Sequence, residues 1–226
     1  MDKKAPKLEF LQNSRTLVHD EDQLIIGSCG GSSKIKTKLN DLKFINKNAN
    51  EKERFDKMIV VTDHDDEQCE KNMLTAMEDI FQVGTMRNNV WKEVAINNFS
   101  GDEIYFDILL VMIPIEKCGA METLLLESIA SRNVYDKNII YQCNQFIDKI
   151  DENQQYLKRR RDFVKAKFNT YFSIRVPEDF YTERQKLFQS FEWENYPYLK
   201  GVLSKLGDLV SNKKSTQNEN SEKITS

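Results

Sequence analysis

A strand followed at once by a dense group of carboxylates is the feature that most constrains this chain. Residues 58–61 form an apolar, mostly β-branched run, and such a run bounded by polar residues predicts a buried strand. Directly after it, residues 63–67 hold four carboxylates in five positions. Residues 68–82 carry apolar side chains at helical spacing, so the acids occupy a strand-to-helix turn. Ligands of open α/β sheets bind at the carboxyl ends of strands, which makes this turn a candidate site.

Crowded carboxylates need either water or a cation around them. Two unit charges about 5 Å apart repel by about 1 kcal/mol in water and by about 3 kcal/mol at an effective dielectric constant near 20. A helix N-terminus returns about 0.3 to 1 kcal/mol per acid, which is enough for a well-solvated turn. If Asp63 and Asp65 instead converge in a cleft, their oxygen ligands suit Mg²⁺ or Mn²⁺. The motif alone therefore leaves two interpretations open, a solvated helix cap and a metal site.

Length and composition limit the classes of protein to consider. The 226 residues favour one domain, or one domain with a small appendage. With 33 basic and 36 acidic residues the net charge is −3, so any binding to nucleic acid requires a local basic patch. No apolar run approaches the roughly 20 residues of a membrane span, and no apolar signal region follows the N-terminus. Four widely spaced cysteines argue against a disulfide framework or a zinc site, so we expect a cytoplasmic protein without a membrane partner.

The remaining pattern alternates expected strands and helices and ends in a helical region. A Gly-rich turn at residues 28–33 either holds a phosphate on free backbone N–H groups or simply uses the conformational freedom of Gly30 and Gly31. A short helix is expected over residues 7–18, and the polar residues 211–226 predict a disordered tail. The other expected strands are 23–27, 90–99 and 104–115. The other expected helices are 34–46, 134–150, 156–172 and 180–191. A Leu-rich helix is also expected to begin near residue 121, and a last helix is expected to end at about residue 206.

A second acid and a basic run complete the candidate residues. Glu122 opens a Leu-rich helix after the most apolar strand, 104–115, just as Asp63 follows its own strand. A first-turn glutamate is commonly only a partner of the helix dipole, but two acids at the ends of two strands would face each other across a sheet edge. The basic run consists of Lys158, Arg159, Arg160 and Arg161, followed by Lys165 and Lys167. Such a run is usually a solvated helix face, yet it is the only local concentration of positive charge suited to a phosphate backbone.

Four segments, in their order and spacing, resemble the Toprim domain of topoisomerases, primases and several nucleases. They are Cys29-Gly-Gly-Ser-Ser-Lys34, Val60-Val-Thr-Asp-His-Asp65, Ile113-Pro-Ile-Glu-Lys-Cys-Gly-Ala-Met-Glu-Thr-Leu-Leu-Leu126 and Lys165-Ala-Lys-Phe-Asn-Thr-Tyr-Phe172. The second segment matches the Asp-x-Asp that follows a strand in this family, and Glu122 stands at the acidic position of the third. Within the family, the chain is most similar to small stand-alone Toprim-like proteins related to the Toprim half of OLD-type nucleases.

The resemblance implies an α/β fold with a Toprim-like, Rossmann-like central sheet flanked by helices and followed by a helical C-terminal part. The implied organisation is an N-terminal helix or extension over residues 1–22, a Toprim-like core over 23–133, a helical part packed on that core over 134–210, and a disordered tail over 211–226. The biological settings in which such proteins act are DNA repair and phage defence.

The resemblance also implies a function and assigns roles to residues. It implies phosphodiester chemistry on nucleic acid that depends on Mg²⁺ (or Mn²⁺), as in a nuclease. Asp63, Asp65 and Glu122 would be metal ligands, and Glu122 would also orient the attacking water. Lys165 or Lys167 would stabilise the charge that develops on the phosphate. The nucleic acid would bind through Lys158, Arg159, Arg160 and Arg161.

The chain also departs from the family pattern. Toprim domains usually begin with a strand that ends in a catalytic glutamate in a Glu-Gly context, and no residue before the first expected strand fits that pattern. One alternative is therefore a Toprim-like module without catalysis that binds a metal, a nucleotide or a partner, and another is that a protein partner supplies the missing acid. A flavodoxin-like or Rossmann-type ligand-binding domain shares the alternating pattern, but the chain has no dinucleotide-binding glycine fingerprint.

Overall fold

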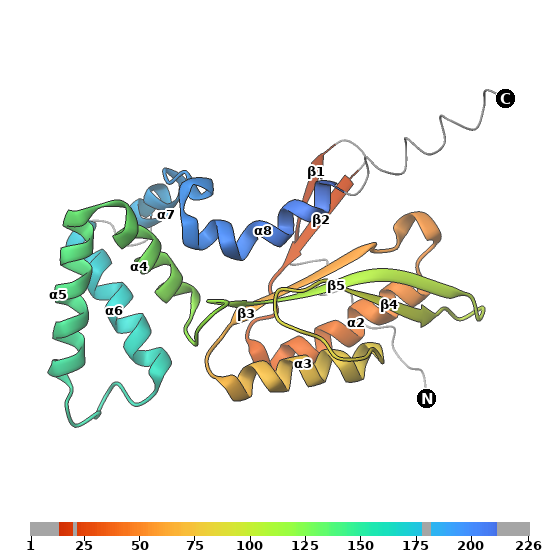
Figure 1. Cartoon of the computed structure of the whole chain (residues 1–226), viewed down its shortest axis with the longest axis horizontal. Coiled ribbons are helices and arrows are strands. Elements are labelled where there is room, and N and C mark those ends of the chain that lie inside the picture. The colour runs from red at the N-terminus through yellow and green to blue at the C-terminus, as the bar shows by residue number, and fades with distance from the viewer. Residues whose placement is uncertain (1–13, 20–21, 178–181, 212–226) are drawn as a thin grey trace. The chain divides into compact units, whose positions relative to one another are not determined.

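The computed structural model describes residues 14–19, 22–177 and 182–211 and shows a mixed α/β protein (Figure 1). The described residues form two compact units. The first contains the residues up to 60, then 71–87 and 91–110. The second contains 61–70, 88–90 and 111–211. The division falls inside two strands, β3 (Lys57–Asp63) and β5 (Glu103–Ile113), which continue from the first unit into the second.

The central sheet is mixed and has the strand order β3-β5-β4. Strand β4 (Lys92–Asn97) runs antiparallel to β5. Strands β3 and β5 are parallel, because the N–H of Asp107 donates to the carbonyl of Asp56 (2.9 Å) and, further along both strands, the N–H of His64 donates to the carbonyl of Ile113 (2.8 Å). The carboxyl ends of β3 and β5 therefore meet at one edge of the sheet. The expected strands at 58–61, 90–99 and 104–115 are confirmed.

The first unit buries one side of this sheet against two helices. Along β4 the side chains of Val94 and Ile96 are buried while Glu93 and Ala95 are exposed, which is the alternation of a half-buried strand. Helix α2 (Ile35–Asn48) and the part of α3 (Glu67–Phe81) from residue 71 lie on one side of the strands (Figure 1). The expected helices over 34–46 and 68–82 are thus confirmed. Side chains buried in this unit include Leu39, Met77, Phe81, Val94, Phe106 and Ile108.

The expectation of a helix near the N-terminus is wrong for the residues that the structure describes. Residues 14–18 belong to a strand, β1 (Ser14–His19), which pairs antiparallel with β2 (Asp22–Gly27). Residues 7–13 lie outside the described residues. Leu17 faces Leu24 across the hairpin, and pairing with a partner strand overrides a weak helical pattern. The expected strand at 23–27 is confirmed, but it belongs to this two-stranded sheet and not to the central one.

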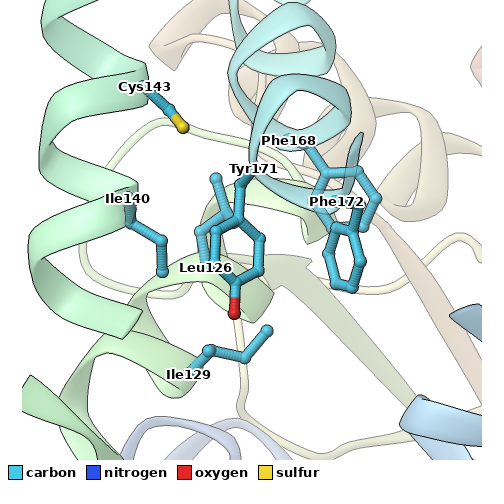
Figure 2. Packing of buried hydrophobic residues seen from close by; sticks show 7 residues of the cluster. All are labelled: Leu126, Ile129, Ile140, Cys143, Phe168, Tyr171 and Phe172. Carbon is cyan, nitrogen blue, oxygen red and sulfur yellow. The ribbon is translucent and has the colours of Figure 1, made fainter. Parts of the chain in front are cut away.

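The second unit is largely helical. The helices α4 (Met121–Arg132), α5 (Val134–Ile150) and α6 (Arg160–Arg175) pack around a shared apolar core, shown in Figure 2. Each helix presents apolar residues at intervals of three or four, so the three stripes meet. The core comprises Leu126, Ile129, Ile140, Cys143, Phe168, Tyr171 and Phe172.

The helical expectations for this region are confirmed with adjusted bounds. Helix α6 begins at Arg160 and not at 156, because the side chain of Asp151 binds the backbone N–H groups of residues 155–157 and holds them in a loop. Helices α7 (Thr182–Gln189) and α8 (Pro197–Ser211) follow. Of the disordered tail expected over 211–226, residue 211 ends α8 and residues 212–226 lie outside the described residues. Short 3₁₀ turns occupy Ser32–Lys34, Glu51–Glu53 and Trp193–Asn195. Across the described ranges, none of the helices has both the length and the apolar character of a membrane span.

Candidate metal and nucleic-acid site

The turn after β3 is built around a buried histidine. His64 is 5% exposed. Its backbone carbonyl accepts a hydrogen bond from the N–H of Gly119 (2.6 Å), and its ring Nδ1 lies 3.0 Å from the carbonyl oxygen of Pro114. A carbonyl only accepts, so this contact requires the proton on Nδ1. The ring and the backbone of His64 therefore attach the β3–α3 turn to the loop over residues 114–120 that follows β5.

The second ring nitrogen of His64 faces an acid. Nε2 lies 3.1 Å from Oε2 of Glu70, in the first turn of α3, although the angles do not satisfy a hydrogen bond. The sequence reasoning did not identify His64 as important. The only available signal was its position inside the Asp63-His-Asp65 motif, and hydrophobic periodicity gives no indication that a polar residue at this place is buried.

Asp63 stands at the start of helix α4. Its Oδ1 accepts a hydrogen bond from the backbone N–H of Met121 at 3.0 Å. The residue at the N-cap position of α4 is Ala120, whose side chain has no acceptor, so Asp63 satisfies a helix N–H from another segment of the chain. This single bond brings Asp63 next to the first turn that carries Glu122. Asp63 and Glu122 therefore lie on neighbouring segments, as their positions after two adjacent strands predict.

The other acids of the turn have separate roles. Oδ1 of Asp66 accepts from the N–H of Cys69 (2.6 Å), which is the helix-cap arrangement at the start of α3. The side chain of Asp65 is exposed, and its backbone carbonyl is an acceptor for a basic residue described next. Burial raises the pKa of the Cys69 thiol, and the nearby charges of Asp65 and Asp66 raise it further. Asp66 is therefore a helix cap, as the first of the two interpretations of this motif predicts.

Arg160 reaches this turn from the first residue of α6. One guanidinium nitrogen donates to the carbonyl of Asp65 at 2.9 Å, and the other donates to the carbonyl of Cys118. Arg160 therefore joins the acidic turn to the loop after β5. Arg159 pairs with Asp162 at 3.0 Å. Two of the four residues expected to bind nucleic acid thus have contacts within the chain, while Lys158 and Arg161 are exposed.

The two lysines expected in catalysis lie further along α6. Nζ of Lys167 is 2.7 Å from Oδ1 of Asp148, an ion pair that joins α6 to α5. Lys165 is exposed; by helix geometry it is about 7.5 Å along the axis and about 140° around it from Arg160. The structure therefore brings together Asp63, the start of α4 and Arg160, while Lys167 is directed to a different partner.

The oxygen ligands at this edge of the sheet include few side chains that a divalent cation could share. Among the described residues, no group of three or more His, Cys, Asp or Glu side chains gathers closely enough to hold an ion by itself. Mg²⁺ usually binds through one or two carboxylates, several waters and the phosphates of its substrate, so an all-protein cage is not required. Asp63, which accepts the N–H of Met121 from the end of β3, and Glu122, in the first turn of α4, are the two candidate carboxylates for that smaller requirement. No family model, curated protein or solved structure matches the chain.

Proposed function

We propose that the chain is a Toprim-like, Mg²⁺-dependent phosphodiester enzyme, a nuclease whose site lies at the carboxyl ends of β3 and β5. The hydrogen bond from the N–H of Met121 to Oδ1 of Asp63 is the observation that carries the proposal. It supports a site in which the carboxylates of Asp63 and Glu122 act together at a helix N-terminus. The order of the four Toprim-like segments and the position of Asp-x-Asp directly after a strand support it further.

Each residue of the proposed site has a distinct task. Asp63 and Glu122 would hold the ion, with Asp65 as an exposed third carboxylate on the same turn. A bound Mg²⁺ would supply an activated water and charge stabilisation at the phosphoryl group. Arg160 fixes the backbone of Asp65 and Cys118, so we assign it, ahead of Lys165 and Lys167, to the positively charged side of the site. Hydrolysis would add water to phosphorus and break one P–O bond, with a proton passing to the leaving oxygen.

The test is the metal-dependent cleavage of DNA and RNA by the wild type and by Asp63→Asn. Asparagine keeps a side-chain oxygen for the N–H of Met121, so the variant loses a charge and keeps the cap. We expect Asp63→Asn to reduce cleavage at least about 100-fold, as expected when a metal ligand is lost. The matched control is Glu67→Gln, which removes an exposed acid from the same turn and should leave the rate unchanged. Equal rates for Asp63→Asn and the wild type would refute the proposal.

One observation favours a second candidate, a Toprim-like module that binds a metal, a nucleotide or a partner without catalysis. Oδ1 of Asp63 and Oδ1 of Asp66 both accept backbone hydrogen bonds at helix starts, so these acids have structural roles that need no reaction. The two candidates separate in the same assay. The module predicts Mg²⁺ binding by the wild type with no hydrolysis of any nucleic acid, whereas a clean metal-dependent turnover excludes it.

A further inference from the structure

The loop between α5 and α6 displays an aromatic ring to solvent. Tyr156 is 77% exposed, the largest exposed fraction among the large hydrophobic side chains of the described residues. A tyrosine ring offers a large flat apolar face and a polar hydroxyl, so an exposed one is suited to contact a partner. Exposure alone is common, and the loop that carries Tyr156 supplies the second observation.

That loop is held in one conformation by a single acid. Asp151 accepts backbone N–H bonds from Gln155 (3.0 Å), Tyr156 (2.9 Å) and Leu157 (2.7 Å) through its carboxylate, and from Gln154 (2.8 Å) through its carbonyl. The bonds from Leu157 and Tyr156 in particular lower the pKa of the Asp151 carboxyl. Gln154 adopts a φ of 50°, the left-handed region that residues other than glycine seldom occupy. The backbone of Tyr156 is therefore fixed while its ring stays exposed.

Positive charge follows the exposed ring directly. Lys158 and Arg161 are exposed, and the intervening Arg160 contacts the carbonyl of Asp65 in the acidic turn. Residues 156–161 contain four basic side chains and no acidic one. The acids before this segment are Asp151, whose carboxylate accepts the backbone N–H groups of residues 155–157, and Glu152, which is exposed. The acid after it is Asp162, which pairs with Arg159. An exposed aromatic ring on a held backbone, followed in sequence by exposed cations, matches a ligand that offers both flat base faces and phosphates.

We propose that residues 151–161 bind single-stranded nucleic acid, with a base stacked on Tyr156 and phosphates on Lys158 and Arg161. A duplex conceals its base faces within the stack, whereas every base of a single strand offers a face to an aromatic platform. This inference rests on the proposed function and names the substrate class of its site. Arg160 connects the two, because it belongs to the basic segment and contacts the turn that holds Asp63 and Asp65.

The test measures the anisotropy of a short fluorescent oligonucleotide, single-stranded or annealed to its complement, in EDTA. We expect the wild type to prefer the single strand, and Tyr156→Ala to weaken that binding about 5- to 150-fold, the range measured for loss of one stacked base. Tyr156→Phe keeps the ring and should bind as the wild type does. Tyr141→Ala removes another exposed tyrosine (58% exposed, on α5) and is the matched control. Replacing Lys158 and Arg161 together should make the negative slope of log affinity against log salt shallower by about 1 to 2.

Three results would overturn the inference: no binding of the single strand by the wild type, a preference for the duplex, or unchanged binding by Tyr156→Ala. Because the assay contains EDTA, it is independent of metal-dependent cleavage. Cleavage without single-strand binding would remove this inference and leave the nuclease proposal standing. Binding that depends on Tyr156 but never leads to cleavage would remove the nuclease proposal and leave this inference standing.

Discussion

Replacing Phe172 by alanine is expected to lower the free energy of unfolding of the second unit by about 3 to 5 kcal/mol, the usual range for a large aromatic removed from a core. The side chain is fully buried. Its ring lies 4.7 Å from that of Phe168, 5.0 Å from that of Tyr171 and 5.4 Å from that of Phe188. Few neighbours can collapse into the cavity, because they belong to several helices packed around the same point (Figure 2).

Urea unfolding followed by tryptophan fluorescence provides the measurement. The ring of Trp193 lies against that of Phe188 in a tilted arrangement, with centroids 5.8 Å apart, so its emission reports on this core. Phe146→Ala, on the exposed side of α5 (53% exposed), is the control and should change stability by less than about 1 kcal/mol. A loss below about 1 kcal/mol for Phe172→Ala would show that the core over α4, α5 and α6 does not stabilise the unit.

Replacing Asp136 by alanine is expected to cost about 3 kcal/mol, near the lower end of the range for breaking a buried ion pair, because Arg175 keeps some contact with water. Asp136 is 8% exposed and accepts from the hydroxyl of Tyr171 (3.0 Å) and the guanidinium of Arg175 (2.6 Å). Burial raises the pKa of Tyr171, so its hydroxyl remains a donor at all ordinary pH values. The alanine variant leaves a buried hydroxyl and a charge without their acceptor.

A double variant separates the ion pair from other effects of the substitution. Asp136→Ala combined with Arg175→Met removes both charges, so it should be less destabilised than the sum of the two single variants, with a coupling energy of about 1 to 3 kcal/mol. Urea unfolding of the four proteins gives that energy. If the destabilisations of the two single variants simply add up in the double variant, the interaction between Asp136 and Arg175 does not stabilise the packing of α5 against α6.

Local patterns predicted most elements of the fold. The apolar run of β5 and the three- and four-residue spacing in α3, α5 and α6 identified these elements because their buried faces are continuous in sequence. The pattern failed for residues 14–18, whose side chains are largely exposed and whose strand depends on pairing with β2. The expected core over 23–133 also included β2, which pairs with β1 outside the central sheet, because periodicity indicates a strand and does not identify its partner.

The candidate site could be predicted only in part, for the same reason. The proximity of Asp63 to the helix of Glu122 followed from two strands that end at one edge of a sheet. The contact of Arg160 with Asp65 links positions 95 residues apart, and the ion pair of Lys167 with Asp148 depends on how two helices pack. No local signal encodes such contacts, so the basic run was interpreted as one surface although its members have different partners.

Calorimetric titration of Mg²⁺ or Mn²⁺ into the wild type, Asp63→Asn and Glu67→Gln tests most directly whether the acids at the ends of β3 and β5 form one cation site. We expect the wild type to bind the ion, Glu67→Gln to bind it equally well, and Asp63→Asn to lose at least about 10-fold in affinity. Glu122→Gln should weaken binding as well, since it removes the second proposed ligand. Equal affinity of the wild type and Asp63→Asn, or no binding by the wild type, would show that these acids do not form a cation site.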